Sequence, residues 1–200
     1  KAFDQPRLSY RGRGTAIGII DTGIDYLNPI FRNPDGSTKI LEIWDQTIEG
    51  NGLLTGTPFD NIHYGTVFSR EEINEALRSD DPFSIVPSRD ENGHGTAMAA
   101  IAAGNGAGVP DFTGAAPEAE LVIVRLKGAK KYLRDFYLIS PDAEAYQEND
   151  IMLGIKFLLL AARRHKLPIT ILVGAGTNMG SHDGTSPLAQ YITEQISNPG

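Results

Sequence analysis

The sequence of 200 residues contains no cysteine. It therefore has no disulfide framework, no thiol nucleophile and no thiolate metal site, and its redox compartment stays open. It also lacks an apolar run long enough for a signal peptide or a membrane span. The longest run, 157–162, is followed at once by Arg163 and Arg164. We expect neither feature within these residues.

Positive charge is also scarce. The chain has 18 Lys and Arg against 25 Asp and Glu, which gives a formal net charge of −7. The densest basic cluster, 163–166, closes an expected helix, where cations offset the negative end of the helix dipole. No stretch could follow a phosphate backbone, so we exclude nucleic acid as a partner. The hydrophobic content of 40% suits one globular domain or most of one.

Apolar runs alternate with helical patterns along the chain. Unbroken apolar or β-branched runs predict strands at 15–20, 40–44, 120–126 and 169–173. Helices are expected at 94–103, at about 149–165 and from about Ser186 onwards. This alternation predicts an α/β fold of three layers around a mostly parallel central sheet, with the chemistry at the carboxyl ends of the strands.

Two of these helices carry further expectations. The segment 94–103 is apolar on all sides, which indicates a buried helix. The last helix has Pro187 in its first position. Its apolar positions are expected to face the core: Leu188, Tyr191, Ile192 and Ile196.

The interval from about 33 to 90 is mostly polar and rich in turns. It contains the strand-like run 40–44 and one short helix with a capping box, Ser69 to Glu72. We interpret the interval as an insertion laid on the fold and not as part of its centre. No internal repeat or low-complexity tract accompanies it.

Two motifs place short polar side chains at the rim of the apolar core. Asp21–Asp25 (DTGID) follows the first expected strand, and Asn92–Thr96 (NGHGT) opens the buried helix. They supply a carboxylate and an imidazole, two of the three groups of an activated-serine hydrolase. At a helix start the dipole disfavours the imidazolium, and a neutral imidazole can act as a general base. A structural hydrogen bond is the ordinary alternative for either residue alone.

With these motifs in place, the chain from about Tyr10 to Ile196 resembles the subtilisin-like serine proteases, or subtilases. Residues 14–25 are similar to their catalytic-aspartate segment and residues 90–104 to their catalytic-histidine segment. The turn 114–121 and the strand and loop 124–129 also match in order. The long interval between Asp21 and His94, and the stretch 176–184, further resemble the clostridial germination-protease (Csp) branch.

The resemblance implies a subtilisin-like fold and a serine endopeptidase in which Asp21 orients His94, the base. An extended peptide or protein substrate would add as an extra strand along one edge of the site. The substrate-binding residues implied are Gly128, Ala129, Gly174, Ala175 and Gly176. The last three stand where the family usually carries Ser-Leu-Gly.

No cofactor is implied. Ile30 falls near the position where the family often has an acidic calcium ligand, so we expect no metal there. The resemblance allows for a propeptide as a second partner, and it favours a secreted or spore-associated location.

The family's oxyanion asparagine and nucleophilic serine would fall after Gly200. Residues 1–200 are then the N-terminal portion of one catalytic domain, with the insertion at about 33–90, and inactive alone. The missing strands would leave an unpaired apolar sheet edge. Ser186 is the nearest substitute nucleophile, but Pro187 follows it and the helix behind it is amphipathic, so Ser186 is assigned as a helix cap.

Other interpretations of the same motifs are weaker. Asp21–Gly23 is also the signature of aspartic proteases, which need two such carboxylates and an all-β fold. Val173–Gly176 with Gly180 resembles a dinucleotide loop, but no helix follows promptly.

Two alternatives concern metal binding and loss of catalysis. His63 and the pair His182–Asp183 lack metal-ligand spacing. A catalytically inactive, subtilase-like pseudo-protease that binds peptides or acts as a scaffold stays open as the alternative function.

Overall fold

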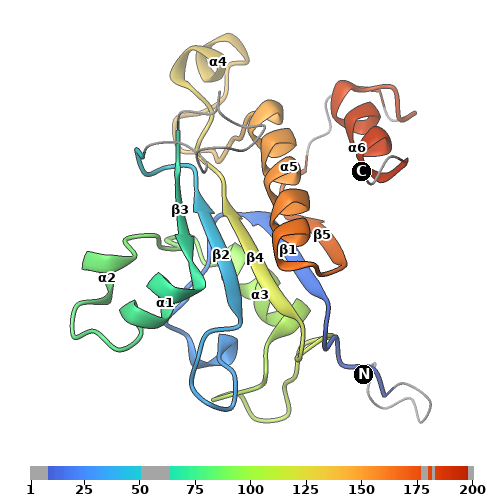
Figure 1. Ribbon diagram of the computed structural model, residues 1–200. Coiled ribbons are helices and arrows are strands. Elements are labelled where there is room, and N and C mark those ends of the chain that lie inside the picture. Colours follow the sequence, from blue (N-terminus) through green and yellow to red (C-terminus); the bar gives the residue numbers. More distant parts are fainter. Residues whose placement is uncertain (1–8, 51–63, 177–179, 182, 198–200) are drawn as a thin grey trace.

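The computed structural model describes residues 9–50, 64–176, 180–181 and 183–197. In these residues, five strands form one sheet in the order β3-β2-β4-β1-β5 (Figure 1). The strands are β1 (Ala16–Asp21), β2 (Ile40–Asp45), β3 (Thr66–Ser69), β4 (Glu120–Arg125) and β5 (Ile169–Val173). Neighbouring strands are parallel except for β2 and β3, which are antiparallel.

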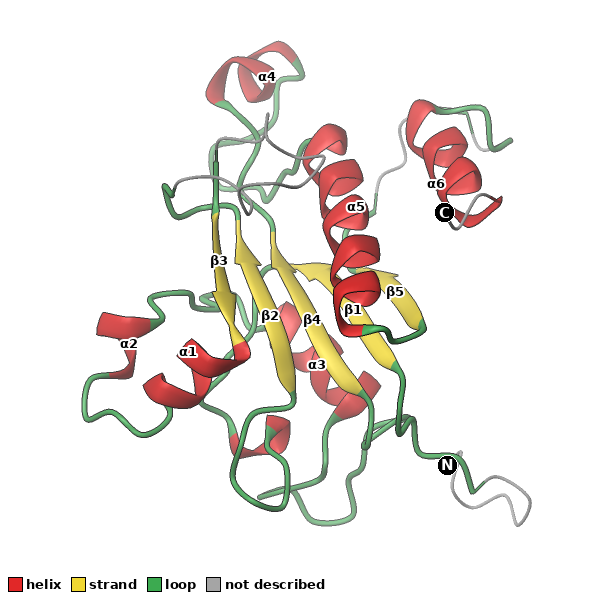
Figure 2. Ribbon diagram, in the orientation of Figure 1, coloured by secondary structure: helices red, strands yellow, loops and turns green. Residues whose placement is uncertain are grey.

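Helices cover both faces of this sheet (Figure 2). They are α1 (Arg70–Ala76), α2 (Pro82–Ile85), α3 (His94–Ala103), α4 (Lys131–Phe136), α5 (Glu148–His165) and α6 (Pro187–Ser197), with a 3-10 helix at Pro29–Phe31. α3 packs on one face together with α1, and α5 packs on the opposite face. The three-layer α/β prediction is confirmed.

β1 is an interior strand of the sheet and ends in the first motif. It lies between β4 and β5, and Ile19 and Ile20 are fully buried. Gly18 lets α5 approach this strand closely. A Cβ at this position would lie 2.7 Å from Leu158 Cδ1. The register pairs Asp21 with Arg125, so both residues stand at the carboxyl edge of the sheet.

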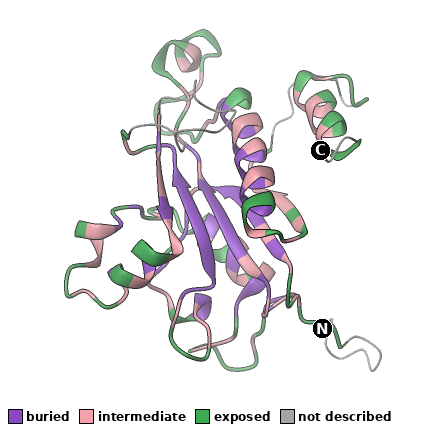
Figure 3. Cartoon of the chain, in the orientation of Figure 1, coloured by how far each residue is buried: buried purple, intermediate pink, exposed green. Residues whose placement is uncertain are grey.

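β2 corrects the interpretation of the interval 33–90. Its residues pair with β4 in the interior of the sheet, and every one of them is buried (Figure 3). Trp44 packs against the rings of Tyr64 and Phe157, with centroids 5.6 and 5.4 Å away. The expectation that this interval lies outside the centre of the fold is therefore wrong for β2. The polar turns on both sides of this short strand gave no indication that it lies in the interior of the sheet.

α3 and α6 are less buried than their patterns predicted. α3 turns Gly95, Ala99 and Ala103 to the core, but Ile101 is 56% exposed. An alanine-rich helix has no polar face to reveal which side meets solvent. In α6, Ile196 is 72% exposed, whereas its other three apolar positions are partly buried against the α5 side of the core.

Among the described residues, β5 has β1 as its one neighbouring strand. An apolar groove of about 770 Å³ runs between β5, α5 and α6, with Ile171, Leu159 and Ile192 in its walls. No described helix is long and apolar enough to cross a membrane.

Candidate active site

Asp21 ends β1 with its side chain 2% exposed. The backbone N–H of Thr22 donates to its Oδ1 at 2.7 Å. Its own carbonyl accepts the N–H of Leu126 at 2.9 Å, which ties the end of β1 to the end of β4. The carboxylate is thus held by the sheet and not by a loose loop.

His94 is the first residue of α3 and meets this carboxylate. Its Nδ1 lies 2.9 Å from Oδ1 and 3.0 Å from Oδ2 of Asp21. The His94 side chain is 49% exposed, so one ring edge faces the buried carboxylate while the ring stays accessible. The structure brings together the two residues that the sequence singled out.

Asp21 also sets the protonation of His94. Its hydrogen bond and its negative charge raise the pKa of the imidazole above the ordinary value. The helix start was expected to favour the neutral ring. The direct bond to a carboxylate outweighs that effect, since it stabilises the imidazolium at contact distance.

Asp90 ties the two motifs to each other. Its Oδ1 accepts from the Thr22 hydroxyl at 2.8 Å and from the Gly93 N–H at 2.9 Å. Its Oδ2 accepts from the N–H and the hydroxyl of Thr96 at 2.8 and 2.6 Å. Burial alone would raise the pKa of Asp90, but the hydrogen bonds from Thr96, Gly93 and Thr22 together hold it below the ordinary value.

We expect Asp90→Ala to lower the free energy of unfolding at pH 7 by about 2–4 kcal/mol, because the hydrogen bonds of this carboxylate to Thr22, Gly93 and Thr96 are lost. The pKa of Asp90 is lowered in the folded state. Its contribution is therefore present above the unfolded pKa and lost as the pH falls through the folded pKa. Urea unfolding at pH 7 and at pH 3 measures this, and the difference between wild type and variant should shrink at pH 3.

The control for this prediction is Asp135→Ala. Asp135 is exposed and pairs with Lys131 on the surface of α4. Surface pairs of this kind contribute little, so the control should change stability by less than about 0.5 kcal/mol. Equal losses in the two variants would contradict the structural role of Asp90.

Two glycines allow the backbone to close around Asp21. A Cβ on Gly95 would lie 2.2 Å from the Gly23 carbonyl oxygen and 3.1 Å from Asp21 Cβ. A Cβ on Gly174, directly after β5, would lie 1.6 Å from Asp21 Oδ2. The first glycine lets α3 approach β1, and the second leaves room for the carboxylate.

Arg125 stands beside Asp21 in the sheet but directs its guanidinium elsewhere. Its Nη1 lies 3.2 Å from Oδ2 of the buried Asp45, and its Nη2 lies 3.7 Å from Glu91. Ser88 donates a further hydrogen bond of 2.6 Å to Asp45. These contacts hold residues 88–91, which lead to the second motif. The side chain of Arg125 is therefore engaged elsewhere, and His94 is the side chain that contacts the Asp21 carboxylate.

The residues expected to bind substrate lie on both sides of Asp21. Gly128 and Ala129 follow β4, and Gly174 to Gly176 follow β5, the two neighbours of β1. Gly174 donates its N–H to the Ile20 carbonyl at 2.8 Å. Gly128 forms a bridge with Tyr146, so one backbone edge of this segment is already paired within the chain.

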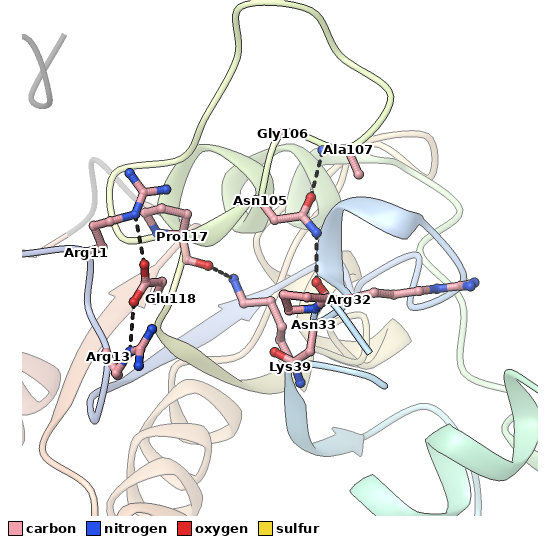
Figure 4. A pocket seen from close by; sticks show the side chains of 11 residues that line it. Arg11, Arg13, Arg32, Asn33, Lys39, Asn105, Gly106, Ala107, Pro117 and Glu118 are labelled. Atoms are coloured by element: carbon pink, nitrogen blue, oxygen red, sulfur yellow. Dashed lines mark hydrogen bonds and ion pairs between the residues drawn. The ribbon is translucent and has the colours of Figure 1, made fainter. Parts of the chain in front are cut away.

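A hollow of about 650 Å³ lies at the other end of the sheet (Figure 4). Lys39, Pro117 and Arg13 line it, and each precedes one of the parallel strands that end near Asp21. The Lys39 ammonium donates to the carbonyls of Ala103 and Pro117. Burial lowers the pKa of Lys39 to about 8. Because the hollow lies at the amino ends of the strands and Asp21 at the carboxyl end of β1, the hollow is separate from the Asp21–His94 pair.

The other sequence candidates take ordinary structural positions where they are described. Ser186 Oγ accepts the N–H of Ala189 at 3.2 Å, as a helix cap does. Ile30 is buried in the core. No group of three metal-ligating side chains occurs within the described residues. His63 and His182 lie outside the described residues.

The sequence model of the subtilase family matches residues 12–150. This range includes both motifs and most of the sheet. The chain belongs to the subtilase family. The subtilisin-like fold that the resemblance implies is confirmed.

Two solved structures are similar to this subtilase chain. The Clostridium perfringens CspB protease is 32% identical with a TM-score of 0.78, over 96% of this chain and 36% of that one. Sphericase is 18% identical with a TM-score of 0.52, over 99% of this chain and 46% of that one, and shows the fold alone. The chain thus spans about a third of the length of the CspB protease.

Sequence reasoning did not predict the contacts that Asp90, Asn92 and Glu144 make near His94. Asp90 had a local signal, because an Asp shortly before a helix start commonly caps the first turn. Asn92 lies within the second motif, but the motif does not reveal that its side chain holds the backbone N–H of His94. Glu144 lies in a segment without any motif, and only the folded chain brings it to Asn92.

Proposed function

We propose that the full-length protein is a serine endopeptidase of the subtilisin type, with Asp21 and His94 as two members of its catalytic triad. The observation that carries this proposal is the contact of His94 Nδ1 with both carboxylate oxygens of Asp21. A buried carboxylate in this position selects the tautomer that leaves Nε2 free to accept a proton. The proposed nucleophile is a serine outside residues 1–200.

In the proposed mechanism, His94 Nε2 takes the proton of the serine hydroxyl as its oxygen attacks the peptide carbonyl. Asp21 stabilises the imidazolium that forms. The proton then passes to the leaving amine, and water hydrolyses the acyl-enzyme with His94 again as the base. The Gly174–Gly176 segment and the Gly128–Ala129 segment are the proposed walls along which an extended peptide binds.

Labelling of the full-length protein with a fluorophosphonate probe tests this proposal. Such a probe reacts with a serine that a neighbouring base activates. We expect labelling and casein cleavage in the wild type and loss of both in His94→Ala. The matched control is His165→Ala. His165 is the last residue of α5, and its ring contacts Glu42 at 2.7 Å and not Asp21. Absence of both labelling and cleavage in the folded wild type would favour the peptide-binding pseudo-protease instead.

A further inference from the structure

We propose that Glu144 and Asn92 form a positioning link between the segment 130–144 and His94. Glu144 holds the Asn92 side chain, and Asn92 holds the backbone at the start of α3. The idea rests on the proposed role of His94 as a base. Its tests measure His94 directly, so they can fail independently of the proposed peptidase activity.

The link consists of two consecutive hydrogen bonds. Glu144 Oε1 accepts from Asn92 Nδ2. Asn92 Oδ1 in turn accepts the backbone N–H of His94 at 3.1 Å. Both ends of the Asn92 amide are thus engaged, which fixes its rotation. Glu144 and Asn92 are far apart in sequence and are both exposed, so packing alone does not explain their contact.

The segment 130–144 is anchored at its base, next to β4. Gly128 and Tyr146 form an antiparallel bridge, and the Ala129 N–H donates to the Ala145 carbonyl at 2.8 Å. Since Ala145 follows Glu144 directly, this short ladder sets where the Glu144 backbone lies. The position of Glu144 is thereby tied to the same sheet that carries Asp21.

Arg134 anchors the returning half of the segment. Its Nη2 donates to the carbonyls of Ser140, Pro141 and Ala143 at 2.7, 2.9 and 2.6 Å. One guanidinium therefore holds the backbone of residues 140–143, immediately before Glu144, against α4. A loop held in this way can keep a carboxylate at a fixed distance from Asn92.

Charged and titratable groups surround His94 from several elements. Asp21 comes from β1, Asp90 and Glu91 precede α3, and Arg125 ends β4. The largest influences on the pKa of His94 are the hydrogen bond and the charge of Asp21, and Asp90 and Glu144 raise it further. The charges of Glu144, Asp21 and Asp90 also raise the pKa of Tyr146, after burial as the main cause.

The experiment is an NMR titration of the full-length protein with histidine-selective 13C and 15N labels, in which His94→Gln assigns the His94 signals. Glu144→Gln keeps a hydrogen-bond acceptor and removes the charge. It should lower the pKa of His94 and leave its backbone amide shift unchanged. Glu144→Ala should lower the pKa and also move the amide shift.

Two further variants separate position from charge. Asn92→Ala keeps the Glu144 charge and should move the His94 amide shift. Arg134→Lys keeps the total charge but loses the three-carbonyl clamp, so it should move the amide shift in the same direction as Glu144→Ala. In peptide hydrolysis by the full-length enzyme, both variants should lower kcat more than they raise KM, because they misplace the base and lie outside the segments proposed to bind the peptide.

Glu91→Gln is the matched control. It removes the same charge one residue from Asn92, but Glu91 is 80% exposed and pairs with Arg125 at 3.7 Å. It should leave the His94 amide shift unchanged. The proposal is overturned if Glu144→Ala and Glu144→Gln give the same amide shift as the wild type. It is equally overturned if Glu91→Gln reproduces the effect of Glu144→Ala.

Discussion

Replacing Asp21 with Asn in the full-length protein is expected to lower kcat by about 10⁴-fold, the loss typical of the orienting carboxylate in Ser-His-Asp triads. The carboxylate accepts at both oxygens, 2.9 and 3.0 Å from His94 Nδ1. An amide presents one acceptor and one donor. It can therefore hold the imidazole in the wrong tautomer and cannot neutralise the imidazolium.

The pH profile supplies an independent measure of the same change. The hydrogen bond and charge of Asp21 raise the pKa of His94. Because a general base must be neutral, activity should rise with pH through that raised pKa. In Asp21→Asn the midpoint of this acidic limb should move to lower pH. Measurement of kcat/KM between pH 5 and 9 on one peptide substrate tests the shift.

Asp25→Asn is the control for Asp21→Asn, since it makes the same substitution in the same motif. Asp25 Oδ1 accepts the Leu27 N–H at 3.2 Å, a bond that the Asn oxygen can keep. We expect near wild-type kcat and an unchanged acidic limb. A residual activity of Asp21→Asn close to that of this control would rule out the proposed role of Asp21.

Sequence patterns predict those strands of the fold that are surrounded by apolar side chains on both faces. β1, β4 and β5 were predicted because parallel strands with helices on both faces are apolar throughout. β2 was predicted as a strand but misplaced, because pairing between β2 and β4 is a long-range contact that no local pattern encodes. The partial burial of α3 was missed because alanine gives little contrast between faces.

The candidate site shows the same division. Asp21 and His94 were found because each lies in a compact motif at the end of an element. Asp90 and Glu144 act through contacts across 68 and 52 residues of sequence, to Thr22 and Asn92 respectively. Such partners are defined by the folded chain. Where no motif marks the pair, a sequence can suggest that a polar residue has a partner, but not which one.

Gly174→Ala is expected to lower kcat by about 10²-fold, the loss that follows from a displacement of about 1 Å in a catalytic group. The new Cβ would lie 1.6 Å from Asp21 Oδ2, so one of the two must move. Asp21 is held by the Thr22 N–H and by His94, and Gly174 is held by its bond to the Ile20 carbonyl. Either displacement changes the geometry that orients His94.

Gly176→Ala distinguishes this contact from a general effect of losing a glycine. A Cβ on Gly176 would meet nothing within 4 Å, and neither Gly176 nor Gly174 has a positive φ. The backbone therefore tolerates alanine at both positions, and the two variants differ in the contact with Asp21. Because Gly176 lies in the segment proposed to bind the peptide, the comparison rests on the pKa of His94, which Gly176→Ala should leave unchanged. An equal pKa of His94 in the two variants would show that Asp21 does not need the space beside Gly174. A lower pKa of His94 in Gly174→Ala alone would show that the displaced group is the Asp21 carboxylate, because the bond that raises this pKa is the one that Asp21 makes.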